Sequence, residues 1–190
     1  MRGSTEFYDN DPEGYSKKTF DADVSEIRDK FLKYVSKGSR ILDLGCGSGR
    51  DTLFFHRNGF VPVPVDGSEG MCAIARRNTG IEVRRLLFSD LDYEDEFDAV
   101  WACSTLLHVP SKELPDILSK VKRAMRDSAM FYLSFKEGTF EGCREGRMYT
   151  DMTQDGLRSL CERCGFKTLE IWSSLEPGRQ TVWCNAIVRK

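Results

Sequence analysis

Short apolar runs alternate along the chain with stretches whose apolar residues recur at helical spacing. The runs predict buried strands, and the spaced pattern predicts helices that each bury one face. The predicted strands are residues 40–45, 61–66, 82–88, 97–104, 129–135, 167–173 and 182–189, and the helical patterns between them cover residues 21–34, 50–58, 68–78, 111–125 and 156–164. Strands that alternate with helices form an open, mostly parallel sheet flanked by helices.

The second predicted strand is unusual because it contains Pro62 and Pro64. Proline has no N–H group to donate to a neighbouring strand and is rare in central strands. Alternate residues of a parallel strand bond to opposite neighbours, so the two prolines remove donors on one side only. We therefore expect Val61, Val63 and Val65 to face the first strand.

Two segments depart from the alternation. Residues 7–20 carry Tyr8, Tyr15 and Thr19 among acids, glycine and proline. This composition does not favour a helix, and we expect a lid there. Residues 135–149 are polar, contain several glycines and follow the fifth strand, so we expect a loop. Ligands of parallel sheets bind outside the carboxyl ends of the strands, which makes this loop a candidate binding segment.

The composition narrows the protein class. The chain has 190 residues, of which 40% are hydrophobic and 31% charged, a balance typical of one globular domain. No apolar run reaches the roughly 18 to 20 residues of a membrane-spanning helix, and the start lacks the layout of a signal peptide. We therefore expect a cytoplasmic protein without a membrane partner. The net charge of −2 gives no overall attraction to nucleic acid.

The cysteines point to a reducing compartment. Seven cysteines, an odd number, are scattered along the chain, so we expect free thiols rather than a disulfide framework. Cys161 and Cys164 have the spacing of a metal or redox pair, but they lie within a helical pattern and no second pair follows at zinc-finger spacing. The sequence therefore predicts no metal site.

The strongest local signal lies between the first strand and the next helix. Asp43 precedes Gly45, Gly47 and Gly49, and Asp66 ends the second strand. Glycines permit sharp turns and the close approach of a ligand to the main chain. A carboxylate about 20 residues after such a loop can accept both hydroxyls of a ribose. A dinucleotide-binding fingerprint does not fit, because its third glycine would be residue 50, which is arginine.

This G-x-G-x-G pattern, with an acid two residues before its first glycine, resembles motif I of the class I S-adenosylmethionine-dependent methyltransferases. Asp66 matches the acid of their second motif, and residues 97–108 are similar to their fourth motif. The resemblance implies an α/β, Rossmann-like sheet of seven mostly parallel strands, with helices on both faces and an antiparallel last strand. It implies a single domain of residues 1–190, with a lid and helix at 1–36 and the catalytic core at 37–190. The chain looks most similar to small bacterial enzymes of the tellurite-resistance and small-molecule type.

The resemblance also implies that the cofactor is S-adenosylmethionine. Asp43 would orient its amino group, Gly45 and Gly47 would pass close to its methionyl and ribose parts, and Asp66 would bind the ribose. The other implied contacts are Tyr8, Tyr15 and Thr19 over the methionyl end, Cys103 beside the donor methyl, and the backbone of Leu87 and Phe88 at the adenine, with Asp90 as the alternative acid.

Methyl transfer mainly requires an acceptor held in line with the sulfur–methyl bond in a water-poor pocket. A base matters only for a protonated acceptor, and His108 and Glu137 are the candidates, with a structural hydrogen bond as the alternative role of His108. The expected acceptor contacts are Ser104, Arg147 and Tyr149, and the last two suit an acidic group on the acceptor. Glu137 could alternatively bind an amine of the acceptor. We expect Arg179 to lie at the edge of the same acceptor site. The other interpretation of these charges is that they pair with one another in solvent.

The sequence thus predicts a methyltransferase that acts on a nitrogen, oxygen or sulfur atom of a small molecule. Two alternatives remain open, an RNA methyltransferase and a module that binds the cofactor without catalysis. Base-modifying relatives usually carry Asn or Asp followed by Pro-Pro and an aromatic residue at the fourth motif, whereas residues 102–104 are Ala, Cys and Ser. This difference disfavours methylation of adenine in DNA, and we expect nucleic acid not to be the partner.

Overall fold

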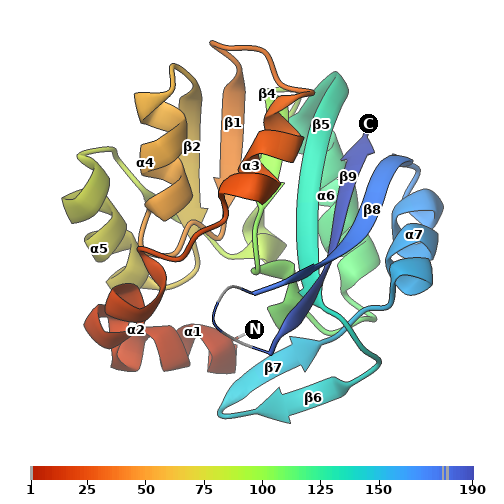
Figure 1. The fold of residues 1–190 in the computed structure, drawn as a ribbon. Helices are drawn as coiled ribbons and strands as arrows, with labels where there is room; N and C mark the ends of the chain where they lie inside the picture. Colours follow the sequence, from red (N-terminus) through yellow and green to blue (C-terminus); the bar gives the residue numbers. More distant parts are fainter. Residues whose placement is uncertain (1, 177, 179) are drawn as a thin grey trace.

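The computed structural model describes residues 2–176, 178 and 180–190, and a seven-stranded sheet forms its centre (Figure 1). The strand order is β3-β2-β1-β4-β5-β9-β8, and β9 runs antiparallel to both of its neighbours while β1 to β5 are parallel. The strands are β1 (Arg40–Leu44), β2 (Val61–Asp66), β3 (Arg84–Arg85), β4 (Phe97–Ala102), β5 (Met125–Lys136), β8 (Lys167–Leu175) and β9 (Val182–Arg189). The predicted fold class is confirmed.

Helices cover both faces of the sheet because the side chains of each strand alternate between them. In β1, Leu42 packs in the core shared with α6 (Leu114–Ala124) and α7 (Gln154–Arg163), whereas Ile41 packs in the core shared with α3 (Ser25–Leu32) and α4 (Arg50–Arg57). α5 (Glu69–Thr79) packs beside α4 and β2. Across the described residues, every helix is too short or too polar to cross a membrane.

The proline-containing strand pairs as predicted. The N–H of Val61 donates to the carbonyl of Ser39 at 3.0 Å, and the carbonyl of Val65 accepts from the N–H of Gly45 at 2.8 Å. Val63 lies between them on the same side of β2, so the valines face β1. This pairing anchors the first residue of the glycine-rich loop directly to β2.

The expectation that the composition of residues 7–20 does not favour a helix is wrong. They belong to α1 (Arg2–Asn10) and α2 (Pro12–Thr19). The carboxylate of Asp11 caps α2 by accepting the N–H of Gly14 at 2.9 Å, and Pro12 occupies the first helical position, where its missing N–H costs nothing. These two residues favour the start of α2, whereas α1 and α2 both also pack on α5.

The prediction of a loop at residues 135–149 is also wrong in part. β6 (Glu141–Arg144) and β7 (Arg147–Thr150) form an antiparallel hairpin. Glu145 and Gly146 at its tip both have positive φ, as a two-residue hairpin turn requires. The predicted strand at 82–88, in contrast, shrinks to two residues and continues into a short 3₁₀ turn, Phe88–Asp90.

The two N-terminal helices and the hairpin lie together at the carboxyl end of β1 and β2 (Figure 1). Asp9 of α1 accepts hydrogen bonds from the Ser68 hydroxyl at 2.5 Å and from the N–H of Gly70 at 3.0 Å, which ties α1 to the start of α5. The N–H of Met148 in β7 donates to the hydroxyl of Ser4 at 3.3 Å. α1 therefore bridges from α5 to the hairpin over this end of the sheet.

Candidate functional site

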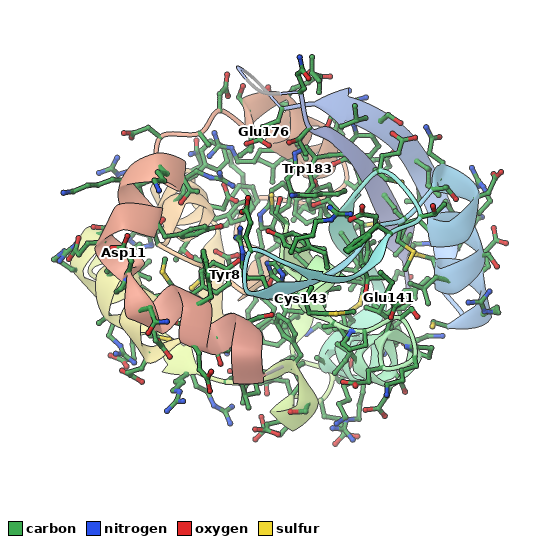
Figure 2. All side chains as sticks on the ribbon, turned by 90° about the horizontal axis from the view of Figure 1, so that it is seen from below. Tyr8, Asp11, Glu141, Cys143, Glu176 and Trp183 are labelled. Carbon is green, nitrogen blue, oxygen red and sulfur yellow. The ribbon has the colours of Figure 1, made fainter. Side chains whose placement is uncertain are left out.

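A cavity of about 770 Å³ lies at the carboxyl end of the sheet, beneath α1 and α2. Its volume is within the range of about 300–1,000 Å³ that is typical of small-molecule sites. Figure 2 views this end of the molecule, with Tyr8 of α1 and Trp183 of β9 on different sides of it and the β6–β7 hairpin beside them. The predicted site residues that line the cavity are Tyr8, Tyr15, Thr19, Asp43, Gly45, Gly47, Asp66, Leu87, Phe88, Cys103, Ser104, His108, Arg147 and Tyr149.

The glycine-rich loop forms part of the cavity wall. Gly45 has a φ of 73° and Gly47 a φ of 55°, conformations that side chains disfavour. A Cβ atom added to Gly45 would also overlap the side chain of Thr105, whereas one added to Gly47 would meet no atom within 4 Å. The lack of a side chain lets Gly45 pack closely against Thr105. At Gly47 it leaves the backbone open to a ligand.

Asp66 holds the loop and faces the cavity. Its carboxylate accepts the N–H of Gly47 at 2.9 Å through one oxygen and the N–H of Ser68 at 2.9 Å through the other. Burial raises its pKa, and the two backbone donors partly oppose that effect. Each oxygen keeps a further lone pair, so the group can accept two more hydrogen bonds from the hydroxyls of a ligand.

Asp43 is a buried carboxyl group suited to a cation. It is 2% exposed and accepts a hydrogen bond from the hydroxyl of Thr52. Burial and the negative charge of Asp51 raise its pKa to about 7. The guanidinium of Arg50, which acts in the opposite direction, is paired with Asp51 at 2.7 Å. A positively charged ligand group would stabilise the ionised form of Asp43.

The pair Arg50 and Asp51 was not predicted as part of the site, yet both residues line the cavity. Asp51 also accepts the indole N–H of Trp101 at 2.9 Å and an N–H of Arg28 at 3.4 Å. Burial raises the pKa of Asp51, but Arg50, the indole of Trp101 and Arg28 together lower it more, so the carboxylate stays ionised. The sequence signal was two adjacent opposite charges at the start of the helix after the glycine loop.

His108 links the lid to the hairpin. Its Nδ1–H donates to the carbonyl of Met148 at 2.7 Å, and Nε2 accepts the hydroxyl of Tyr8 at 2.7 Å. Burial lowers its pKa to about 4, and the positive charges of Arg147 and Lys136 act in the same direction. The imidazole is therefore neutral at pH 7. Its catalytic role stays a prediction, and it would require Tyr8 to release Nε2.

Glu137 requires a correction, because its side chain is exposed and lies outside the cavity lining. Neighbouring residues of β5 point to opposite sides, and the side chains of this strand that line the cavity are Tyr132, Ser134 and Lys136. The roles predicted for Glu137, as base or amine ligand, do not fit this position. Asp90 is likewise exposed and outside the lining, which favours Leu87 and Phe88 at the adenine position. Arg179 lies outside the described residues.

A polar network of β5, β8 and β9 forms another part of the cavity wall, and the sequence did not predict it. The hydroxyl of Tyr132 donates to Oδ1 of Asn185 at 2.8 Å, and Nδ2 of Asn185 donates to the hydroxyl of Ser174 at 3.0 Å. All three residues line the cavity. Asn185 interrupts an otherwise apolar strand, which is the signal that could have revealed the network.

Comparison with known proteins agrees with this geometry. Residues 41–128, which include the glycine loop, Asp66 and the end of β4, match the family model described as a methyltransferase domain. Residues 41–128 thus carry a methyltransferase domain, in agreement with the fold of the solved S-adenosylmethionine-dependent neighbours. The resemblance to S-adenosylmethionine-dependent methyltransferases found in the sequence is confirmed, and so is the cofactor that it implied.

The chain has relatives in several bacteria. It is 26% identical over 117 residues to an uncharacterised methyltransferase of Staphylococcus carnosus, covering 57% of this chain and 56% of the relative. It is 25% identical over 168 residues to methyltransferase GfsG of Streptomyces halstedii, covering 77% of this chain and 59% of the relative. The chain thus spans less than two thirds of the length of these two relatives.

A solved structure shares the fold. The 1,6-didemethyltoxoflavin-N1-methyltransferase of Burkholderia thailandensis superposes with a TM-score of 0.79 at 20% identity, covering 97% of this chain and 84% of that one. That structure holds S-adenosylhomocysteine and 1,6-didemethyltoxoflavin.

The raised pKa of Asp43 gives the methyltransferase domain a testable pH dependence. An ammonium group beside Asp43 requires the carboxylate, so affinity for S-adenosylhomocysteine should fall as the pH drops through 7 and should level off about one pH unit above it. With a pKa of about 7, affinity at pH 5.5 should be about 20-fold weaker than at pH 7.5. Calorimetry at a series of pH values measures this. Asp43→Asn should bind weakly with a flat profile; an equally steep profile in that variant would assign the effect to another group.

Proposed function

We propose that this chain transfers the methyl group of S-adenosylmethionine to a nitrogen, oxygen or sulfur atom of a small molecule. The observation that carries the proposal is the enclosure of the cavity by the N-terminal helices and the hairpin at the carboxyl end of the sheet. We also propose a cytoplasmic location, which the odd number of cysteines and their free thiols support.

The cavity residues fit the parts of the cofactor. Asp66 offers two acceptor oxygens to the ribose hydroxyls, and Asp43 offers a carboxylate to the ammonium group. Gly47 leaves the backbone open beside them. When bound, the cofactor supplies an electrophilic methyl: a lone pair of the acceptor forms the new bond to carbon while the electron pair of the sulfur–carbon bond returns to sulfur, and any proton of the acceptor leaves to water or a base.

The end of β4 is where the acceptor meets the methyl group. Ser104 has a φ of 55°, and its N–H donates to the hydroxyl of Ser134 in β5 at 2.9 Å. This bond holds the turn after Cys103 against β5. Cys103 and Ser104 both line the cavity. An acceptor that binds at the carboxyl ends of β4 and β5, inside the cavity, would be shielded from bulk water, which favours the loss of the sulfonium charge during transfer.

The enclosure favours a small acceptor over RNA. Tyr8 is joined to His108, and Ser4 to Met148, so α1 bonds directly to the residues that border the cavity on the hairpin side. A polynucleotide would have to displace α1 to reach Cys103, whereas a small molecule fits beside the cofactor. The Burkholderia thailandensis neighbour, which binds a small molecule in the same fold, supports this choice.

A labelling experiment distinguishes the candidates. The chain is incubated with methyl-labelled S-adenosylmethionine and, separately, with an ultrafiltered small-molecule extract or with total RNA. We expect label in the small-molecule products and its loss in the Asp66→Asn variant. Label in RNA would refute the small-molecule proposal in favour of an RNA methyltransferase. Cofactor binding without label in either fraction would favour the non-catalytic module.

A further inference from the structure

We propose that the methyl acceptor is a small anion whose oxyanion group binds between Lys136 and Arg147, beside the ring of Tyr149. This inference rests on the proposed function and specifies the chemistry of its acceptor. It is carried by the positions of these two cations in the cavity wall and by the lack of equal negative charge around them.

Lys136 is the first of the two cations. It is the last residue of β5, and its side chain lines the cavity. Its ammonium nitrogen lies 4.4 Å from the centre of the Tyr149 ring. Within the described part of the chain, no carboxylate lies within ion-pair distance of it. Burial and the guanidinium groups of Arg144 and Arg147 lower its pKa, and the carboxylates of Asp151 and Glu145 oppose them only in part.

Arg147 is the second cation, and its side chain is 13% exposed. The guanidinium lies 5.3 Å from the centre of the Tyr149 ring and donates weakly to the Tyr8 hydroxyl at 3.4 Å. Its Nε is buried and has no hydrogen-bond partner among the described residues. An unpaired donor of this kind is costly to bury, which a ligand acceptor would relieve.

The nearby carboxylates do not neutralise this pair. Asp151 is engaged by Arg144. Glu145 approaches Arg147 at 3.5 Å, but its side chain is 83% exposed, so water screens the interaction. Glu176 accepts the indole N–H of Trp183 at 3.3 Å. An oxyanion between Lys136 and Arg147 would therefore meet an excess of positive charge in a partly buried wall, where charge-assisted hydrogen bonds are strong.

The walls around this position are aromatic. Tyr8, Tyr132, Tyr149 and Trp183 all line the cavity. Aromatic acids combine a flat apolar body with an oxyanion and therefore serve as probes of the site. Benzoate carries a carboxylate, phenyl phosphate carries a phosphate, and benzamide has nearly the shape of benzoate without its charge.

The experiment titrates each probe into the full chain loaded with S-adenosylhomocysteine and follows binding by ligand-observed NMR. We expect benzoate, phenyl phosphate or both to bind at least about tenfold more tightly than benzamide, the effect of about one charge-assisted hydrogen bond. The tighter of the two anions identifies the oxyanion. Lys136→Gln should remove most of that preference, and Lys136→Arg should keep it.

Lys167→Gln is the matched control, because Lys167 is also a lysine at the end of a strand, but it begins β8 outside the cavity. It should leave the preference for anions unchanged. Affinity for S-adenosylhomocysteine should stay within about twofold in all variants. Equal binding of the anions and benzamide, or a preference that survives Lys136→Gln, would overturn the inference alone. Failure of the wild-type chain to bind S-adenosylhomocysteine would overturn the proposed function and the inference together.

Discussion

Asp66→Asn should weaken the binding of S-adenosylhomocysteine by about 100-fold. Hydrogen bonds to a charged group contribute about 1.5–3 kcal/mol each, and the ribose offers two hydroxyls to this carboxylate. The amide keeps one acceptor oxygen and loses the charge, so a loss of about 3 kcal/mol is expected, equal to about two orders of magnitude in the dissociation constant. The remaining oxygen must also serve the N–H groups of Gly47 and Ser68. Calorimetry measures the change.

Asp90→Asn is the control for this substitution. Asp90 is an acid close in sequence, but it is exposed and does not line the cavity. Its replacement should change the affinity by less than about twofold. If Asp90→Asn weakened binding as much as Asp66→Asn, the assignment of the ribose to Asp66 and of the adenine to Leu87 and Phe88 would be wrong.

Gly45→Ala should lower the free energy of unfolding by about 2–5 kcal/mol. A left-handed backbone costs a side chain about 1–2 kcal/mol, and forcing an atom into an occupied space costs about 1–3 kcal/mol more. The new Cβ would overlap the side chain of Thr105, and Gly45 is bonded to Val65 through its N–H, so the loop cannot easily move away. Urea denaturation monitored by circular dichroism measures the loss.

Gly47→Ala separates the two contributions. Gly47 also has a positive φ, but a Cβ atom there meets no neighbour within 4 Å. The substitution should cost only the backbone term of about 1–2 kcal/mol. Equal losses at Gly45 and Gly47 would show that the contact with Thr105 is not what restricts position 45.

The sequence correctly predicted the positions of residues that belong to clear strand patterns. Asp43, the glycines and Asp66 lie in or beside two strands whose apolar patterns are clear, so the rule for parallel sheets puts them at one edge. The pairing of β2 followed from the alternation of its valines and prolines. Both conclusions depend only on the local periodicity of the sequence, which long-range contacts do not change.

The N-terminal helices and the hairpin were missed because their stability comes from contacts made across the chain. α1 and α2 are short and have poor helix propensity, and their packing on α5 and β7 supplies what the local sequence lacks. The hairpin had a local signal in Glu145 and Gly146, but the charges around it read equally well as a solvated loop.

The sequence alone also could not show which charged side chain lines the cavity. Lys136 and Glu137 are adjacent, and the register of β5 in the sheet decides that the lysine faces the cavity. Asn185 and Tyr132 come from strands more than 50 positions apart and meet only because β9 pairs with β5. Such contacts follow from the sheet order rather than from motifs.

The most direct measurement is a calorimetric titration of the wild-type chain with S-adenosylhomocysteine, with a nicotinamide dinucleotide as the control ligand. The carboxylates of Asp43 and Asp66 and the open backbone at Gly47 predict one site with a dissociation constant of about 1–50 μM, and no binding of the dinucleotide. No heat with S-adenosylhomocysteine, or tighter binding of the dinucleotide, would contradict the assignment of this cavity to a methyl donor.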